Sequence, residues 1–355
     1  MATTTIDEAK VEAFLGQIVS EAGAAMNAAL VRIGDALGLY RAMGDAQAVS
    51  AAVLAARTET HERYVREWLN AQAAGGFVTY DPSDDRYTLP AEHAIALADE
   101  DSPFAQAGLF QAVTGAIRAE ERVTEAFRTG DGVGWHEHHD SLFHGVERLF
   151  GVGYRTSLVA DWIPALDGVE AKLHAGARVA DLGCGHGLST ILLAQAFPGS
   201  SFDGYDVHAE SIEIARRRAA EAGVGDRARF FVAAADDYPG HDYDLVTCFD
   251  ALHDMGDPVA AARRAHQSLR PDGTWMIVEP LAGDRIEDNL HPLGRLGYGF
   301  STLVCTPGSL SQEGRMGLGT QAGQERLTEV IVGGGFRSVR RAAETQINIV
   351  LEARP

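Results

Sequence analysis

Three groups of residues, widely separated in the chain, have types and spacings that could do chemistry. The first is Val179-Ala-Asp-Leu-Gly-Cys-Gly-His-Gly187, in which an apolar strand ends, three glycines alternate and a helix begins. Glycines let the backbone turn tightly and approach a ligand closely, and a helix N-terminus favours a polar or anionic group. The spacing differs from G-x-G-x-x-G, which disfavours a nicotinamide cofactor.

The second group is a single acid, Asp206, at the end of the next expected strand. An acid at that position is well placed to hold the two hydroxyls of a ribose. Ligands of open α/β sheets lie at the carboxyl ends of the strands, and both motifs fall there. We therefore expect the glycine loop and Asp206 to face one ligand.

The third group is Asp250-Ala-Leu-His-Asp-Met255, which follows a further apolar strand. A hydroxyl is a weak nucleophile until it loses its proton, and a histidine with a pKa near neutrality can remove it. A histidine that packs structurally fits this position equally well. Both interpretations of His253 stay open.

Strands alternate with helices from Ala177 onward, which predicts a doubly wound, mostly parallel α/β sheet. The last two strands are joined by a short connection, which requires an antiparallel pair, so one edge strand is expected to run antiparallel. The seven expected strands of this Rossmann-like sheet span residues 178–182, 201–206, 229–233, 243–249, 273–279, 336–342 and 346–352.

The N-terminal part reads as helices over 19–42, 50–57 and 59–70, followed by a hairpin of 77–80 with 86–89. Helix, helix, helix and hairpin in this order predict an α-helical winged-helix domain. We place the domains at 1–100 (winged helix), 101–170 (helical linker contributing to the substrate pocket) and 171–355 (the α/β domain).

The motif Asp-Leu-Gly-x-Gly-x-Gly, the acid ending the second strand and the Ala-Leu-His segment together resemble class I S-adenosylmethionine-dependent methyltransferases. The N-terminal domain resembles the dimerisation domain of small-molecule O-methyltransferases, so the resemblance covers nearly the whole chain. It implies S-adenosyl-L-methionine as cofactor, S-adenosyl-L-homocysteine as product and a small-molecule acceptor methylated at a hydroxyl oxygen. It also implies a homodimer formed through the N-terminal domain.

The resemblance further implies roles for individual residues. Asp181 and the glycine loop face the methionine part of the cofactor, and His253 is the candidate general base because plant-type O-methyltransferases have a His-Asp pair at the matching place. The acid that meets the adenine amine in the family stands one or two positions later here. The implied cofactor-binding residues are Asp181, Gly183, Cys184, Gly185, Gly187, Asp206, Val207, Ala235, Asp236, Phe249 and Asp250.

A further cluster, apart from the three groups above, combines histidines and carboxylates: Trp135-His-Glu-His-His-Asp140 with His144 one turn later. Such residues could bind a metal, or they could line the substrate cavity; no tight metal-site spacing is matched, so we predict no metal. The long insertion 280–322 is expected to form a lid or part of the acceptor pocket. The predicted substrate-pocket residues are Trp135, His139, Tyr154, Arg155 and Phe300.

Composition restricts the partners. With 30 basic and 50 acidic residues the net charge is −20, which repels phosphate backbones, so nucleic acid is not an expected partner. No apolar run is expected to reach the ~18 residues of a membrane helix, and the N-terminus is not expected to be a secretory signal. Three widely spaced cysteines favour a reducing, cytoplasmic location. A winged-helix regulator that senses S-adenosylmethionine, or a protein of this fold with a non-methylating activity, remain the alternatives.

Overall fold

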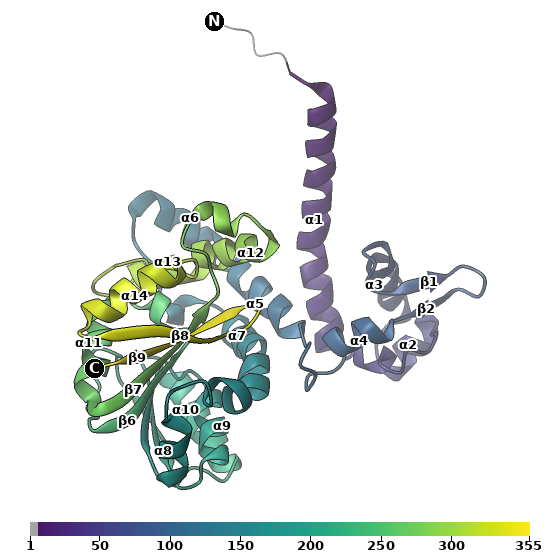
Figure 1. The fold of residues 1–355 in the computed structure, drawn as a ribbon. Coiled ribbons are helices and arrows are strands. Elements are labelled where there is room, and N and C mark those ends of the chain that lie inside the picture. Colours follow the sequence, from purple (N-terminus) through teal and green to yellow (C-terminus); the bar gives the residue numbers. More distant parts are fainter. Residues whose placement is uncertain (1–5) are drawn as a thin grey trace, which may run out of the picture. The chain divides into compact units, whose positions relative to one another are not determined.

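The computed structural model describes residues 6–355, which form two compact units. The first unit comprises residues 6–114 and Ser141–Val152, and the second comprises Gly115–Asp140 and Gly153–Pro355 (Figure 1). The segment 101–170 is thus divided between the two units. Each unit has its own hydrophobic core and is described separately.

The first unit contains the expected winged helix. Three helices precede an antiparallel hairpin in which Tyr80 lies opposite Tyr87. Its core includes Trp68, whose ring packs edge-on against Tyr40 at 5.0 Å. The elements are α1 (Glu8–Ala36), η1 (Arg41–Met43), α2 (Ala51–Arg57), α3 (Glu62–Ala74), β1 (Thr79–Asp81), β2 (Arg86–Thr88), α4 (Ala91–Leu97), α5 (Ala107–Ile117, ending just beyond this unit) and α7 (Asp140–Gly153).

Helix α1 begins earlier than the sequence pattern predicts, because the Asp7 side chain caps it by accepting from the backbone N–H groups of Ala9 and Lys10. Its first turns extend away from α2, α3 and α4 (Figure 1) and expose apolar side chains. By length and composition alone, α1 could cross a membrane. The expectation that no apolar run reaches that length is wrong here, because α1 is longer than the sequence pattern predicts and its apolar residues outweigh its few charged ones. Core helices of soluble proteins and signal sequences meet the same criterion.

The second unit is built on a seven-stranded sheet in the order β5-β4-β3-β6-β7-β9-β8. The strands are β3 (Arg178–Leu182), β4 (Ser201–Asp206), β5 (Ala228–Val232), β6 (Tyr243–Phe249), β7 (Leu269–Pro280), β8 (Ser338–Glu344) and β9 (Asn348–Arg354). The predicted mostly parallel sheet is confirmed. Its one antiparallel strand, β9, lies between β7 and β8, one place in from the edge.

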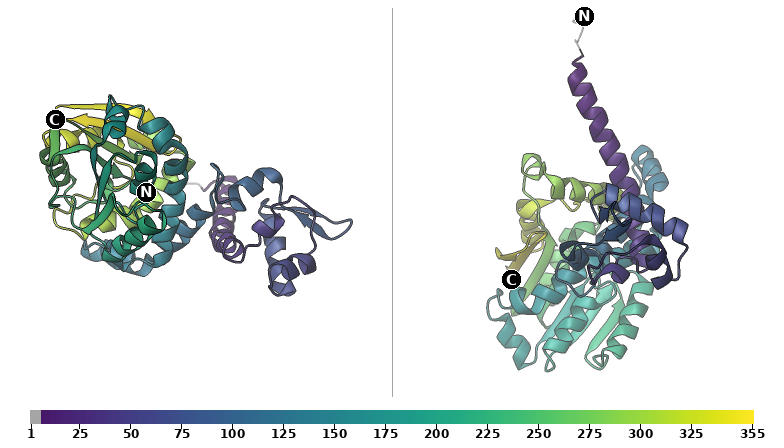
Figure 2. Two further views of the ribbon diagram at one scale, coloured as in Figure 1. Left: turned by 90° about the horizontal axis from the view of Figure 1, so that it is seen from below. Right: turned by 90° about the vertical axis from the view of Figure 1, so that its right-hand side faces the viewer.

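Helices cover both faces of this sheet (Figures 1 and 2). One face packs against η3 (Tyr154–Trp162), α8 (Val169–Ala175), α9 (Leu188–Ala196) and α10 (Ala209–Glu221). The other packs against α11 (Pro258–Ser268) and α14 (Gly323–Gly333). The remaining elements are α6 (Glu120–Thr129), η2 (Trp135–Glu137), η4 (Leu252–Asp254), η5 (Ile286–Asn289), α12 (Pro292–Phe300), η6 (Ser301–Cys305) and α13 (Thr306–Leu310).

Two features of this unit were not predicted from the sequence. The insertion 280–322 contains short helices. Two segments, η3 and η6, are π-helices, which are rare and often occur at functional sites.

Candidate functional site

The glycine loop follows β3 and is fastened to β4. Gly183, Gly185 and Gly187 have φ values of +72°, +50° and +80°, in the left-handed region that favours glycine. The N–H of Gly185 donates to Asp206 Oδ2 at 2.9 Å, and the N–H of His208 donates to Asp206 Oδ1 at 2.8 Å. Burial raises the pKa of Asp206. The carboxylate therefore fixes the loop and keeps further acceptor capacity.

Asp181 anchors the helix behind the loop. Its Oδ2 accepts from the hydroxyls of Ser189 (2.7 Å) and Thr190 (2.6 Å), and its Oδ1 accepts from Thr247 (3.0 Å). Burial raises the pKa of Asp181 to about 6, against the effect of these three hydrogen bonds. Because hydroxyls of this chain bind both oxygens, the observed contribution of Asp181 is to hold the start of α9 against β3 and β6.

Asp250, after β6, has a positive φ and two side-chain hydrogen-bond partners. Its φ is +49°, which is uncommon for a residue other than glycine. Tyr154 Oη donates to Asp250 Oδ2 at 2.8 Å, and Asn348 Nδ2 donates to Oδ1 at 2.7 Å. Burial, followed by the nearby Glu279 carboxylate, raises the pKa of Asp250 to about 8. The Tyr154 ring also packs on Phe249 at 5.3 Å.

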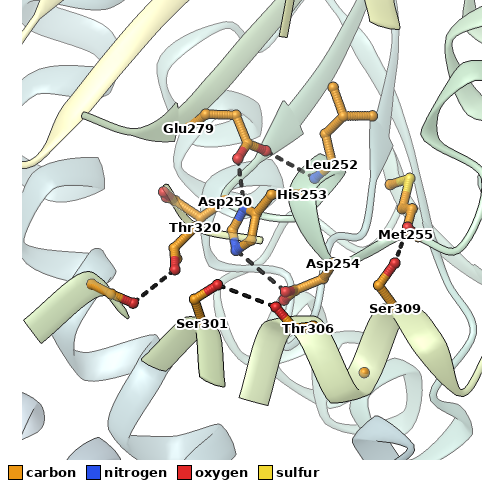
Figure 3. Close-up of polar contacts among 12 residues, drawn as sticks. Asp250, Leu252, His253, Asp254, Met255, Glu279, Ser301, Thr306, Ser309 and Thr320 are labelled. Atoms are coloured by element: carbon orange, nitrogen blue, oxygen red, sulfur yellow. Dashed lines mark hydrogen bonds and ion pairs between the residues drawn. The ribbon is translucent and has the colours of Figure 1, made fainter. Parts of the chain in front are cut away.

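His253 lies in the short helix η4 between two carboxylates (Figure 3). Its Nδ1 lies 2.5 Å from Glu279 Oε2, and its Nε2 lies 3.3 Å from Asp254 Oδ1. Glu279 also accepts from the N–H of Leu252 at 2.9 Å. Burial by itself lowers the pKa of His253, but the Asp254 and Glu279 carboxylates outweigh it and hold the pKa well above its usual value.

The carboxyl ends of neighbouring strands bring these groups to one edge of the sheet. The glycine loop follows β3, Asp206 ends β4, Asp250 and His253 follow β6, and Glu279 lies near the end of β7. This is the edge at which ligands of open α/β sheets bind. Among the cofactor residues implied by resemblance, Cys184 is buried in the loop, Val207 is 65% exposed, Ala235 is half-buried and Asp236 is exposed.

The predicted substrate-pocket residues are placed unevenly. Tyr154 joins the Asp250 group, Trp135 and Phe300 are half-buried, and Arg155 and His139 are exposed. His139 contacts Arg118.

His138, which precedes His139 in the chain, is buried. His138 is 6% exposed, and neither of its ring nitrogens has a hydrogen-bond partner. Burial lowers the pKa of His138.

Sequence reasoning missed Glu279 and Asn348. Glu279 is an acid at the end of an apolar strand, a signal that the sequence contained. Asn348 carried no such signal, because its place beside Asp250 depends on β9 pairing with β7.

Comparisons with known proteins agree with this architecture. Residues 180–275 match the family model "Methyltransferase domain", and residues 25–99 match "Rv2258c-like winged HTH domain". The glycine loop, Asp206, Asp250 and His253 all lie within the segment that matches the methyltransferase model. The chain carries that domain behind an N-terminal winged helix-turn-helix domain, as the sequence predicted.

Two of the curated relatives illustrate the similarity. The ubiquinone biosynthesis O-methyltransferase of Pseudomonas aeruginosa is 33% identical over 118 residues, covering 33% of this chain and 47% of the relative. The 27-O-demethylrifamycin SV methyltransferase of Amycolatopsis mediterranei is 37% identical over 139 residues, covering 37% and 50%. The chain thus spans about half the length of the curated relatives it matches.

Among solved structures, human N-acetylserotonin methyltransferase in complex with S-adenosylmethionine superposes with a TM-score of 0.71. The match covers 100% of this chain and 99% of the human one, at 16% identity. At that identity the likeness concerns the fold.

Proposed function

We propose that this protein transfers the methyl group of S-adenosylmethionine to a hydroxyl oxygen of a small molecule. The observation that carries the proposal is the His253–Glu279 pair at the strand ends that also hold the glycine loop and Asp206. Methyl transfer is an in-line displacement in which the sulfur–methyl bond breaks as the oxygen–methyl bond forms. Holding donor and acceptor in line supplies much of the rate, and both curated relatives named above are methyltransferases.

For the cofactor, we propose that Asp206 binds the ribose and Asp250 faces the methionyl amine. Two carboxylate oxygens offer about four acceptor positions, and two backbone N–H groups use only part of those on Asp206. The exposed Val207 side chain is available to pack on the adenine, and Ala235 with Asp236 is proposed to meet its amine.

For the acceptor proton, we propose that His253 Nε2 receives it. The two carboxylates beside His253 favour the imidazolium form, which cannot accept a proton. An acceptor hydroxyl that displaces Asp254 from Nε2 removes one of these charges and lowers the pKa of His253. Glu279, which remains on Nδ1, then keeps the ring oriented.

The deciding experiment combines titration calorimetry with turnover of a panel of phenolic acceptors, followed with a labelled methyl donor. His253→Ala should bind S-adenosylmethionine normally and lose about 10²–10⁴-fold in turnover, the usual size of general-base catalysis. Wild-type turnover in that variant would remove the general-base role. Cofactor binding with no methylated product from any acceptor would instead favour a non-methylating activity.

We also propose that the chain forms a homodimer through α1. Val11, Leu15 and Ile18 recur at a spacing of three or four residues, which places them on one side of a helix. They are 43%, 54% and 45% exposed. A second copy of the helix, rich in alanine over 22–29, can approach closely and cover this stripe.

The α1 proposal is checked by light scattering of Leu15→Glu/Ile18→Glu, which should be monomeric. Ile347→Glu replaces an exposed apolar residue of the second unit and should leave the dimer intact. A wild-type monomer that sediments with lipid vesicles would make α1 a membrane contact instead.

We propose that the winged helix does not read nucleic acid. On α3, Arg66 pairs with Glu62 and Asp85, and Arg63 pairs with Glu67. These partners neutralise the cations that would meet phosphates. Retention of a labelled DNA pool that depends on S-adenosylmethionine would favour the regulator alternative. The cytoplasmic location stays a prediction, supported by three buried free cysteines.

A further inference from the structure

A cluster of three metal-ligating side chains lies beside the site and comes from two distant parts of the chain. His253 and Asp254 belong to η4, whereas Cys305 ends the π-helix η6. The histidine nitrogen, a carboxylate oxygen and the cysteine sulfur all lie within 4.8 Å of one another. His253 is 3% exposed and Cys305 is 5% exposed.

The spacing of these atoms suits a tetrahedral ion. Ligand distances of 2.0–2.3 Å around zinc place neighbouring ligand atoms about 3.3–3.8 Å apart. His253 Nε2 and Asp254 Oδ1 already lie 3.3 Å apart. A nitrogen, an oxygen and a sulfur are donors that zinc accepts together, with a fourth position left open.

The surroundings of His253 supply the support that a metal ligand requires. Ligating histidines usually give their other ring N–H to a carboxylate, which orients the ring. Glu279 takes this role at Nδ1, and its position is fixed by the N–H of Leu252 (Figure 3). With Nδ1 paired to Glu279, the opposite ring nitrogen, Nε2, faces Asp254.

Asp254 gives a second, independent indication. Its Oδ1 is buried and lies 3.3 Å from His253 Nε2, yet the geometry of this contact does not form a hydrogen bond. A ring nitrogen facing a buried carboxylate oxygen needs a positive centre between the two atoms, either a proton or a cation. The Asp254 side chain is 29% exposed, which leaves an ion a way in.

We infer that His253, Asp254 and Cys305 form a binding site for a thiophilic divalent cation, with Zn²⁺ as the physiological ion of this class. The inference does not depend on methyl transfer or on the identity of the acceptor. It has one consequence for the proposed function: a bound cation uses the Nε2 lone pair of His253. Zinc and the acceptor proton therefore compete for the same atom, and zinc should inhibit transfer.

The test uses the full chain, stripped with a chelator and titrated with Co²⁺ as a spectroscopic substitute for Zn²⁺. We expect one ion per chain by mass spectrometry and a thiolate-to-cobalt charge-transfer band in the near ultraviolet. Cys305→Ser should lose the band, and Asp254→Asn should bind at least tenfold more weakly. Cys248→Ala, which removes another buried thiol from β6, should keep the band.

The inference is overturned if the folded protein binds no cobalt at micromolar concentrations, or if the band survives in Cys305→Ser. In that case a proton, not a cation, lies between His253 and Asp254. Cobalt binding by a protein whose chelator-stripped form methylates no acceptor would refute the proposed function alone. Methylation by a protein that binds no cobalt would refute the metal site alone. Both variants are first checked for native circular dichroism.

Discussion

Replacing Asp250 by asparagine should stabilise the protein at neutral pH while weakening its hold on the cofactor. The pKa of Asp250 is raised from 3.8 to about 8 by burial and by Glu279. Between these two values the folded chain binds more protons than the unfolded chain, so stability falls as the pH rises. Asparagine does not titrate, and the penalty disappears.

The size of the effect follows from the pKa difference. Each pH unit inside the window corresponds to about 1.36 kcal/mol. Between pH 5 and pH 7, the free energy of unfolding of wild type should therefore fall by up to about 2.7 kcal/mol relative to that of Asp250→Asn. The side chain is nearly isosteric: Oδ1 still accepts from Asn348, and Nδ2 can donate to the Tyr154 oxygen, so both contacts survive.

The assay is urea unfolding at pH 5, 6 and 7, monitored by tryptophan fluorescence. The reported quantity is the free energy of unfolding of wild type minus that of the variant. Taking the difference removes contributions that both proteins share, such as that of Asp181. Asp237→Asn, at an exposed position, serves as the control and should show no pH-dependent difference. Parallel curves for wild type and Asp250→Asn would refute the reasoning. Calorimetry should show weaker S-adenosylmethionine binding, because asparagine cannot ionise to pair with the methionyl amine.

Three further outcomes follow from the contacts. Asp206→Ala should abolish S-adenosylmethionine binding in calorimetry, since the variant loses the ribose acceptor and the link to Gly185; unchanged affinity would contradict the ribose assignment. Gly187→Ala should weaken S-adenosylmethionine binding as strongly, because φ at Gly187 is +80° and a Cβ would lie 2.8 Å from the Phe230 ring. If the variant bound S-adenosylmethionine as tightly as wild type, the loop would have adapted to the Cβ. Gly145→Ala should lower the thermal midpoint, because the new Cβ would lie 2.2 Å from the backbone nitrogen of Ala112. Overpacking of this kind costs about 1–3 kcal/mol, and an unshifted midpoint would mean that α5 and α7 move apart freely.

The central strands could be located in the sequence almost to the residue, because buried parallel strands read as short continuous apolar runs. The predicted bounds of β3, β4 and β6 match those of the structure. The insertion after β7 was harder to assign. Its many glycines lower helix propensity, yet α12 and α13 form there.

The candidate site was predictable only where one segment contained the signal. The glycine loop, Asp206 and His253 each end or follow a recognisable strand. Cys305 meets His253 through the packing of η6, and Asn348 meets Asp250 through the pairing of β9. Contacts between segments so far apart are set by tertiary structure, which no local pattern records.

The π-helix at 154–162 makes the site sensitive to chain length. Tyr154 begins this segment, whereas Leu158 and Trp162 are buried in the core within it. A π-turn holds about one residue more than an α-turn, and each residue of an α-helix advances about 100° around the axis. We expect the deletion of one residue from this stretch to rotate Tyr154 by about that angle relative to the buried residues Leu158 and Trp162, and so away from Asp250. Such one-residue changes in length give evolution a way to reshape this site without substituting any residue that forms it.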